Sequence, residues 1–531
     1  MALDSAIAEI SIKQNLEQFL VVLSVSLSVA TLSRLFSWFR RIPYTLLLVI
    51  VGLGLAFVNV RLVNLSPELI LEIFLPPLLF EAAWNIRWRD LKDSLVPVGL
   101  FAVLGVIISV LGIAFPVSQL TGLSLPIALL LGASLSATDP VSVVALFREL
   151  GAGKRLTVVM EGESLFNDGV AVVAFVLLVG IPLGIEEFSV PVTIARFATF
   201  AGLGIGVGCL VGFGISYITQ RFDYSLVEQS LTLVSAYGTY LLVEELGGSG
   251  VIGVVTVGLI LGNFGSRIGM TPRTRLIVSE FWEFLSFFVN SIVFLLIGDQ
   301  IRFGSLAQNL DLIVVAIISV LLTRAIVIFG LGTISNQLSS TTFNWREFTV
   351  LWWGGLRGGV SIALALSVPT LLSGRQEIID AVFGVVLFTL LFQGLTTQFF
   401  LEKLDLIGDQ AQRQQYTEGL ARRTALNRVL EHLKRIEDSP ELDPEFYRYQ
   451  HQLVLGQLRS VEEEITQLQT QHPQLLTVSM EQLQEELVDI EADTYAEFIR
   501  AGRLNNNLSP MLQGVLNQAI EKIVEEEREA A

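Results

Sequence analysis

The sequence predicts an all-α polytopic membrane protein with about thirteen transmembrane helices and a helical cytoplasmic tail. Of the 531 residues, 52% are hydrophobic and only 16% are charged, and the mean hydropathy is +0.63. Apolar runs separated by short polar segments recur up to residue 402. A run of roughly 17–25 apolar residues is long enough to cross a bilayer as a helix. This composition and this spacing are typical of polytopic membrane proteins.

The predicted spans follow one another closely along the chain. They lie near residues 16–36, 43–60, 66–83, 95–118, 126–147, 156–181, 193–218, 227–244, 249–264, 280–298, 310–333, 347–371 and 379–401. The two spans on either side of Glu244-Glu245-Leu246-Gly247-Gly248 can also be interpreted as one long interrupted helix.

The distribution of basic residues predicts the orientation. With the N-terminus outside, fourteen lysine and arginine residues fall in inward loops and four in outward segments. Cytoplasmic loops of membrane proteins are enriched in these residues. An odd number of spans then places the C-terminal tail in the cytoplasm. We expect an integral protein of the cell (inner) membrane.

The composition changes at Lys403, which predicts a transmembrane domain over 1–402 and an acidic helical cytoplasmic domain over 403–531. The tail contains 24 acidic and 13 basic residues, within a chain of net charge −17. Such a surface does not favour nucleic acid or anionic lipid as a partner. All three histidines lie in this tail, so no membrane histidine is expected to relay protons.

Four carboxylates interrupt the apolar runs within a short stretch of the chain. They are Asp139, Glu161, Glu163 and Asp168. A carboxylate at the centre of a membrane helix costs about 3 kcal/mol on insertion scales. Such residues mark functional sites by default, so this cluster is the first candidate for the site.

The segment Thr138-Asp139-Pro140 predicts an interrupted helix. Pro140 lacks a backbone donor and disfavours helical dihedrals at Asp139. Freed carbonyls at membrane depth are tolerated where they line a cavity, and secondary transporters use them to coordinate ions. The stretch from Gly354 to Gly359 is too rich in glycine for a regular helix. Two such interruptions in corresponding halves are a sequence indicator of a transporter binding site.

The span after the first interruption presents two polar faces. At about 100° per residue, Glu161, Ser164 and Asp168 share one face, while Glu163 and Asn167 lie on another. Carboxylate, hydroxyl and carbonyl oxygens suit a hard cation. Because Asp168 is also titratable, it is predicted to hold either a metal ion or a proton.

These motifs resemble those of the monovalent cation/proton antiporters of the first cation-proton-antiporter family, the NhaP type related to animal sodium/proton exchangers. The matching residues are Thr138-Asp139-Pro140, the run Glu161 to Asp168, and Gly355-Leu356-Arg357-Gly358-Gly359. The resemblance covers roughly residues 15 to 402. It implies inverted repeats with two interrupted crossing helices, as in NhaA and NhaP, a homodimer, and roles in sodium transport, pH homeostasis and salt tolerance.

The resemblance also implies which residues form the site. Four oxygen-bearing residues are implied to bind the cation, Na⁺, and the proton. They are Asp168, Asp139, Ser164 and Thr138. Three further residues are implied to support it: Asn167, Glu163 and Arg357, with Glu163 paired to Arg357. Electrogenic relatives have Asp where this chain has Asn167, which implies electroneutral exchange of one cation for one proton.

Other polar residues in the spans have two open interpretations each. Glu81 either lines the ion path or reaches the interface beside Trp84. Glu161 shares the Asp168 face, yet it lies roughly two turns nearer the cytoplasmic end. Glu283 and Asn290 are favoured as polar contacts between helices, which are common in membrane proteins.

The function that these patterns favour is secondary antiport of Na⁺ for H⁺ by alternating access, with the two substrates competing at Asp168. The sequence does not rank Na⁺, Li⁺ and K⁺, so K⁺/H⁺ antiport is an alternative. A cation channel would need a continuous pore. An intramembrane protease is disfavoured because the sequence has no Gly-x-Gly-Asp or His-Glu-x-x-His motif, so no enzymatic activity is expected. We expect no cofactor, and without a Walker motif no use of ATP.

Overall fold

The computed structural model describes residues 18–498, apart from positions 19, 34, 36–42, 59–65, 186–188, 221–223, 267–268, 340–341, 408–409, 437–442, 472–486, 488–489, 492–493 and 496–497. All regular elements of this described part are helices. The chain divides into two compact units, Met1–Leu406 and Ile407–Ala531. Each unit is considered by itself below.

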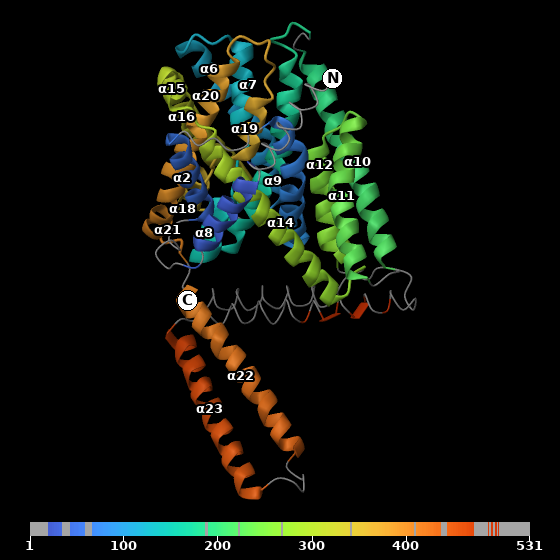
Figure 1. Ribbon diagram of the computed structural model, residues 1–531. Coiled ribbons are helices and arrows are strands. Elements are labelled where there is room, and N and C mark those ends of the chain that lie inside the picture. Colours follow the sequence, from blue (N-terminus) through green and yellow to red (C-terminus); the bar gives the residue numbers. More distant parts are fainter. Residues whose placement is uncertain are drawn as a thin grey trace, which may run out of the picture. The chain divides into compact units, whose positions relative to one another are not determined.

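The expected spans coincide with helical segments of the first unit, which confirms the all-helical polytopic fold (Figure 1). The first is described over Leu20–Ser33. Continuous α-helices form α2 (Tyr44–Phe57), α9 (Lys154–Val179), α10 (Val190–Thr219), α11 (Ser225–Glu245) and α14 (Pro272–Asp299). The short helices α4 (Trp88–Asp93) and α15 (Phe303–Gln308) lie between spans. Among the described residues, seven helical segments are long and apolar enough to cross a membrane by length and composition alone.

Several spans contain a short π-helical segment, which the hydropathy pattern does not predict. They are η2 (Leu69–Phe74) with α3 (Leu75–Asn85); α5 (Leu95–Gly99), η3 (Leu100–Leu104) and α6 (Gly105–Leu120); α12 (Gly250–Ile260) with η4 (Leu261–Gly265); α16 (Leu310–Ala325), η5 (Ile326–Leu331) and α17 (Gly332–Leu338); and α20 (Arg375–Leu387), η6 (Phe388–Gly394) and α21 (Leu395–Lys403).

The two predicted interruptions are both present. The first separates α7 (Leu125–Ser136) from α8 (Val141–Leu150), and the second separates α18 (Trp345–Trp353) from α19 (Gly359–Leu366). The backbone N–H of Asp139 donates to the carbonyl oxygen of Leu356 at 2.9 Å. The interruptions therefore contact each other, although they lie far apart in the sequence.

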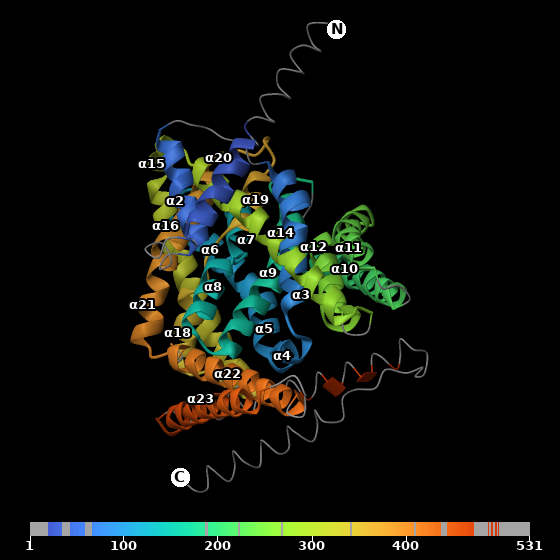
Figure 2. The ribbon, with the colours of Figure 1, turned by 60° about the horizontal axis from the view of Figure 1, so that its bottom comes forward.

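Glycines allow the helices around this crossing to pack closely. Helices α10, α11 and α12 lie side by side at one edge of the unit (Figures 1 and 2), and a Cβ at Gly208 would lie 2.7 Å from the Gly253 carbonyl oxygen. On α14, a Cβ at Gly298 would lie 2.8 Å from the Leu53 nitrogen of α2. Small residues at such positions let membrane helices approach at backbone distance. The contact with α2 fixes one side of α14.

The loop between α11 and α12 resolves the choice between one interrupted helix and two. Helix α11 ends at Glu245, and α12 begins at Gly250. Gly247 between them has φ +74°, a left-handed conformation that glycine adopts without steric cost. The chain therefore turns here and continues as a separate helix.

The second unit contains two paired helices, α22 (Gln410–Ile436) and α23 (Pro444–Gln471). Tyr416, Val461 and Ile465 form the buried centre of this pair, and the Gln469 amide donates to the Tyr416 hydroxyl at 2.8 Å. The described part of the tail is thus helical, as its composition indicated.

Candidate cation site

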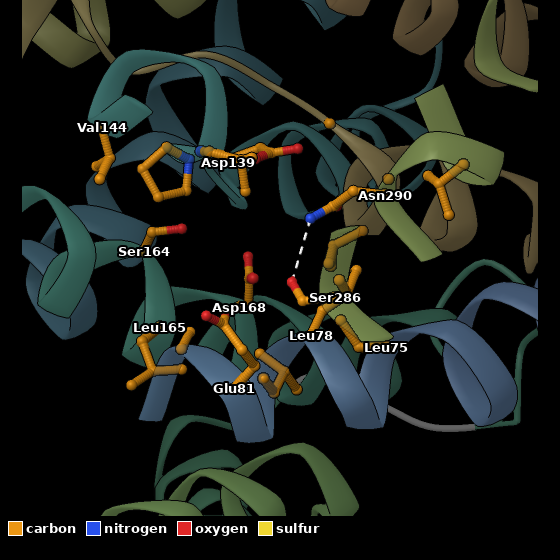
Figure 3. Close-up of a pocket in the computed structure, with 18 of the residues that line it drawn as sticks. Leu75, Leu78, Glu81, Asp139, Val144, Ser164, Leu165, Asp168, Ser286 and Asn290 are labelled. Atoms are coloured by element: carbon orange, nitrogen blue, oxygen red, sulfur yellow. Dashed lines mark hydrogen bonds between the residues drawn. The ribbon is translucent and has the colours of Figure 1, made fainter. Parts of the chain in front are cut away.

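A cavity of about 280 Å³ lies beside the first interruption. Its walls come from α3, α9, α14 and both interruptions. The four oxygen-bearing residues singled out in the sequence all line it: Thr138, Asp139, Ser164 and Asp168. Figure 3 shows the Asp168 side chain pointing into this space, with Ser164 on one side and Asn290 on the other. The structure thus brings the predicted residues together around one hollow.

Helix α9 holds the first interruption at Thr138. The Ser164 hydroxyl donates to the Thr138 carbonyl oxygen. The Asn167 amide donates to the Thr138 hydroxyl at 2.9 Å, and its oxygen accepts the Thr138 backbone N–H at 3.2 Å. Asn167 is buried and does not line the cavity. Its amide therefore fixes the irregular backbone that presents oxygens to the cavity.

The Asp139 carboxylate has a local structural task as well as a place in the cavity wall. Its Oδ1 accepts the backbone N–H of Val141 at 3.1 Å. This bond satisfies one of the free donors in the first turn of α8. The carboxylate consequently has a defined position at the start of α8.

Asp168 differs from these neighbours because its carboxylate is poorly satisfied. The residue is only 9% exposed, and its Oδ1 is buried without a hydrogen-bond partner in the described part of the chain. A buried charged group without partners is costly. A bound cation or a proton would remove that cost, so the geometry suits alternating occupancy.

The second interruption supplies a buried positive charge. Arg357 is 1% exposed, and its Nε donates to the Leu135 carbonyl oxygen at 2.6 Å, near the end of α7. Its Nη1 donates to the Gly355 carbonyl oxygen at 2.7 Å. Positive charge at a helix C-terminus is favourable because the free carbonyls carry partial negative charge. Arg357 therefore joins the two interruptions.

The ion pair implied for Glu163 with Arg357 is wrong. Glu163 instead forms a bidentate pair with Arg324 of α16, in which Arg324 Nη2 lies 3.0 Å from Glu163 Oε2. Both side chains are buried. The reason is that the Arg357 guanidinium is already bonded to backbone carbonyls, which leaves the carboxylate to the other buried arginine. Arg324 also donates to the Leu351 carbonyl oxygen of α18 at 3.2 Å.

Glu81 and Glu161 both line the cavity. Arg148 Nη2 donates to Glu161 Oε1 at 2.5 Å, and the Arg148 side chain is 63% exposed. The Asn85 amide donates to Glu81 Oε1 at 2.5 Å. The structure places both carboxylates beside the hollow that contains Asp168, and a role for them in ion passage stays a prediction.

Sequence reasoning gave too little weight to α14. Ser286 and Asn290 are buried and line the cavity from this helix, although Asn290 had been interpreted as a contact between helices. The signal that indicates them is the spacing of Glu283, Ser286 and Asn290, which places all three on one face of an otherwise apolar helix. All three line the cavity.

Comparison with known proteins agrees with this geometry. The family model described as "Sodium/hydrogen exchanger, transmembrane" matches residues 24–403. The Na(+)/H(+) antiporter ApNhaP of Aphanothece halophytica is 68% identical over 97% of this chain and 99% of its own length. The low-affinity Na(+)/H(+) antiporter NhaS1 of Synechocystis sp. is 62% identical over 96% and 98%.

A solved structure shares the fold. The sodium proton antiporter MjNhaP1 from Methanocaldococcus jannaschii, determined at pH 8, superposes with a TM-score of 0.61 at 21% sequence identity. The match covers 74% of this chain and 99% of that one. With the family model and the two close relatives, the chain belongs to the sodium/hydrogen exchanger family, as its motifs predicted.

Proposed function

We propose that this integral membrane protein exchanges Na⁺ for H⁺ electroneutrally, one for one, with both substrates competing at Asp168. The observation that supports this most directly is the Asp168 carboxylate, which lines a cavity with one oxygen unpartnered within the described residues. Both of the relatives described above are named Na⁺/H⁺ antiporters, which agrees with it. The family is one of transporters and not a class of enzymes.

The oxygen ligands proposed for Na⁺ are the Asp168 and Asp139 carboxylates, the Ser164 hydroxyl and the Thr138 carbonyl or hydroxyl. They are hard donors of the kind that alkali cations prefer. Protonation of Asp168 would remove the charge that attracts the cation. Alternating access would then carry either Na⁺ or a proton, because one carboxylate serves both.

The test is proton flux in vesicles reconstituted with the full chain. Na⁺, Li⁺ and K⁺ gradients are compared, and the flux should follow Na⁺. If only a K⁺ gradient drives proton flux, the substrate is K⁺ and not Na⁺. Cation conduction without coupled proton movement would establish a channel and overturn the proposal.

Competition and electroneutrality have separate measurements. Lowering the pH should raise the apparent KM for Na⁺, because protons occupy the same carboxylate. An imposed membrane voltage should drive no proton gradient in symmetric Na⁺, because one charge moves in each direction. A KM that does not change with pH rejects the shared site, and voltage-driven flux rejects the one-for-one ratio.

We further propose the cellular setting: a homodimer in the cell membrane, with its N-terminus outside and the 403–531 domain in the cytoplasm. The excess of basic residues in the inward loops supports this orientation. Cysteine labelling at the two ends, from each side of the membrane, tests it. Truncation after Leu406, where the first compact unit ends, should leave coupled exchange in place if the tail is a separate domain.

A further inference from the structure

We infer that Asn290 of α14 supplies a neutral oxygen to the cation and helps to set selectivity among alkali ions. This inference rests on the proposed exchange at Asp168. It gives a binding role to α14, which lies outside the motifs that identify the family. The cavity wall opposite Ser164 then becomes part of the binding site.

The position of the Asn290 side chain supports this role. The residue is only 5% exposed and lines the same cavity as Asp168. Figure 3 shows it across the cavity from Ser164, with Asp139 above and Asp168 below. Its Nδ2 donates to the Ser286 hydroxyl at 3.4 Å, one turn back on α14. Among the described residues, its Oδ1 accepts no hydrogen bond.

This bonding pattern is not that of a structural contact between helices. A polar residue that joins membrane helices donates to or accepts from a neighbouring helix. Among the residues that the structure describes, Asn290 bonds only within α14, which leaves its carbonyl oxygen available to a ligand. The adjacent Ser291 also bonds within its own helix, donating to the Phe287 carbonyl oxygen at 2.6 Å, but it is fully buried and does not line the cavity.

The backbone of α14 is held in place for this task. Gly298 packs at backbone distance against α2, and the Trp84 indole of α3 donates to the Ser279 hydroxyl of α14 at 2.9 Å. A helix fixed on two sides can hold a ligand at a defined distance from Asp168. Cation selectivity depends on the number and strength of such ligands.

The chemistry of an amide suits the proposed one-for-one exchange. An amide oxygen binds a hard cation through its dipole and has no charge of its own. It therefore adds a ligand without adding a second titratable group beside Asp168. Na⁺ would gain affinity, while the number of protons exchanged stays the same.

The experiment uses the full chain in vesicles and measures KM and maximal rate for Na⁺, Li⁺ and K⁺. Asn290→Ala removes the oxygen, and Asn290→Leu removes it at nearly the original volume. Losing one hydrogen-bonding ligand should raise the KM for Na⁺ about five- to tenfold, with the maximal rate within about twofold of the parent. The ratio of Na⁺ to Li⁺ KM should change as well. Ser291→Ala is the matched control and should behave as the parent.

A folded Asn290→Leu or Asn290→Ala protein with the parent's KM for Na⁺ and the parent's ion ratio overturns the inference. Detergent melting identifies folded protein, and either variant alone decides the question. This outcome is distinct from failure of the proposed exchange, which is reported by Asp168→Asn. If Asp168→Asn loses flux while Asn290→Leu behaves as the parent, the exchange mechanism stands and only the role of Asn290 fails.

Discussion

The two interrupted helices use the same backbone device for different purposes. The first contains a proline, and its freed backbone and the Asp139 side chain line the cavity. The second contains four glycines between positions 354 and 359, and its Arg357 reaches the carbonyl of Leu135 at the end of α7. The first interruption therefore contributes polar groups to the candidate site, while the second, which also lines the cavity, binds the first through Arg357.

The residue types at each interruption account for this difference. A proline stops the helix but keeps side chains that can face a ligand. Glycine lets one backbone approach another closely, and a Cβ at Gly358 would collide with the Asp139 carboxylate. In this chain, the proline break therefore presents a side chain to the cavity, and the glycine break allows close backbone contact with it.

The largest expected effect comes from Asp168, the carboxylate in the cavity beside the first interruption. Asp168→Asn should abolish Na⁺-driven proton flux, because an amide neither releases a proton nor supplies a carboxylate. The protein should remain folded, since Asp168 makes few bonds that the amide would lose. Flux in reconstituted vesicles and melting in detergent are the two measurements. Substantial remaining flux would show that the Asp168 carboxylate is not required for exchange.

The next effect tests the close contact at the glycine break. Gly358→Ala should force the two interruptions apart, because the new methyl group meets the Asp139 carboxylate. A displacement of about 1 Å at a reacting centre can cost about a hundredfold in rate, and exchange should fall on that scale. Gly153→Ala is the control, because nothing lies within 4 Å of a Cβ at Gly153. Equal exchange rates for Gly358→Ala and Gly153→Ala would show that close packing at Gly358 is not needed for transport.

A third change should separate stability from transport. Glu163→Ala or Arg324→Ala leaves one buried charge unpaired, at a cost of about 3–5 kcal/mol in the free energy of unfolding. The KM for Na⁺ should change less, because neither residue lines the cavity. Melting curves of the two single variants and the double variant measure this. The double variant should lose less than the sum of the singles, and additive losses would argue against the pair.

The smallest expected effect compares two serines that donate to adjacent carbonyls of the first interruption. Ser164 donates to the Thr138 oxygen from α9, and Ser361 donates to the Ala137 oxygen from α19 at 3.4 Å. Ser164→Ala should raise the KM for Na⁺ about fivefold, because it removes a ligand. Ser361→Ala should change the KM by less than about twofold, because its long bond is weak. The reverse order would assign ion binding to the second interruption.

Much of this arrangement was predictable because it is written in local sequence. Pro140 and the glycines after Trp353 mark the interruptions, and helical spacing places Ser164 and Asp168 on one face. All of these follow from rules that connect neighbours within about one or two turns. The apolar runs gave the helical segments for the same reason.

What failed depends on contacts between distant segments. The resemblance implied Arg357 as the partner of Glu163, and the structure has Arg324 instead. Helical spacing could not correct this, because it gives the direction of a side chain and not the helix that the side chain meets. The π-helical segments are similar: η5 and η6 interrupt apolar runs whose composition is ordinary for an α-helix. The place of Asn290 in the cavity wall could not be predicted, because this cavity exists only in the assembled structure.

The unpartnered oxygen of Asp168 also bears on how the protein avoids leaking ions. An unloaded, ionised Asp168 would have to be enclosed without a bound cation or proton each time the site changed sides. The cost of a buried charge without its partner, about 3–5 kcal/mol, corresponds to a rate that is lower by about two to four powers of ten. If Asp168 is the shared site, as proposed, this electrostatic cost would suppress movement of the unloaded site and would favour tight coupling of the two gradients.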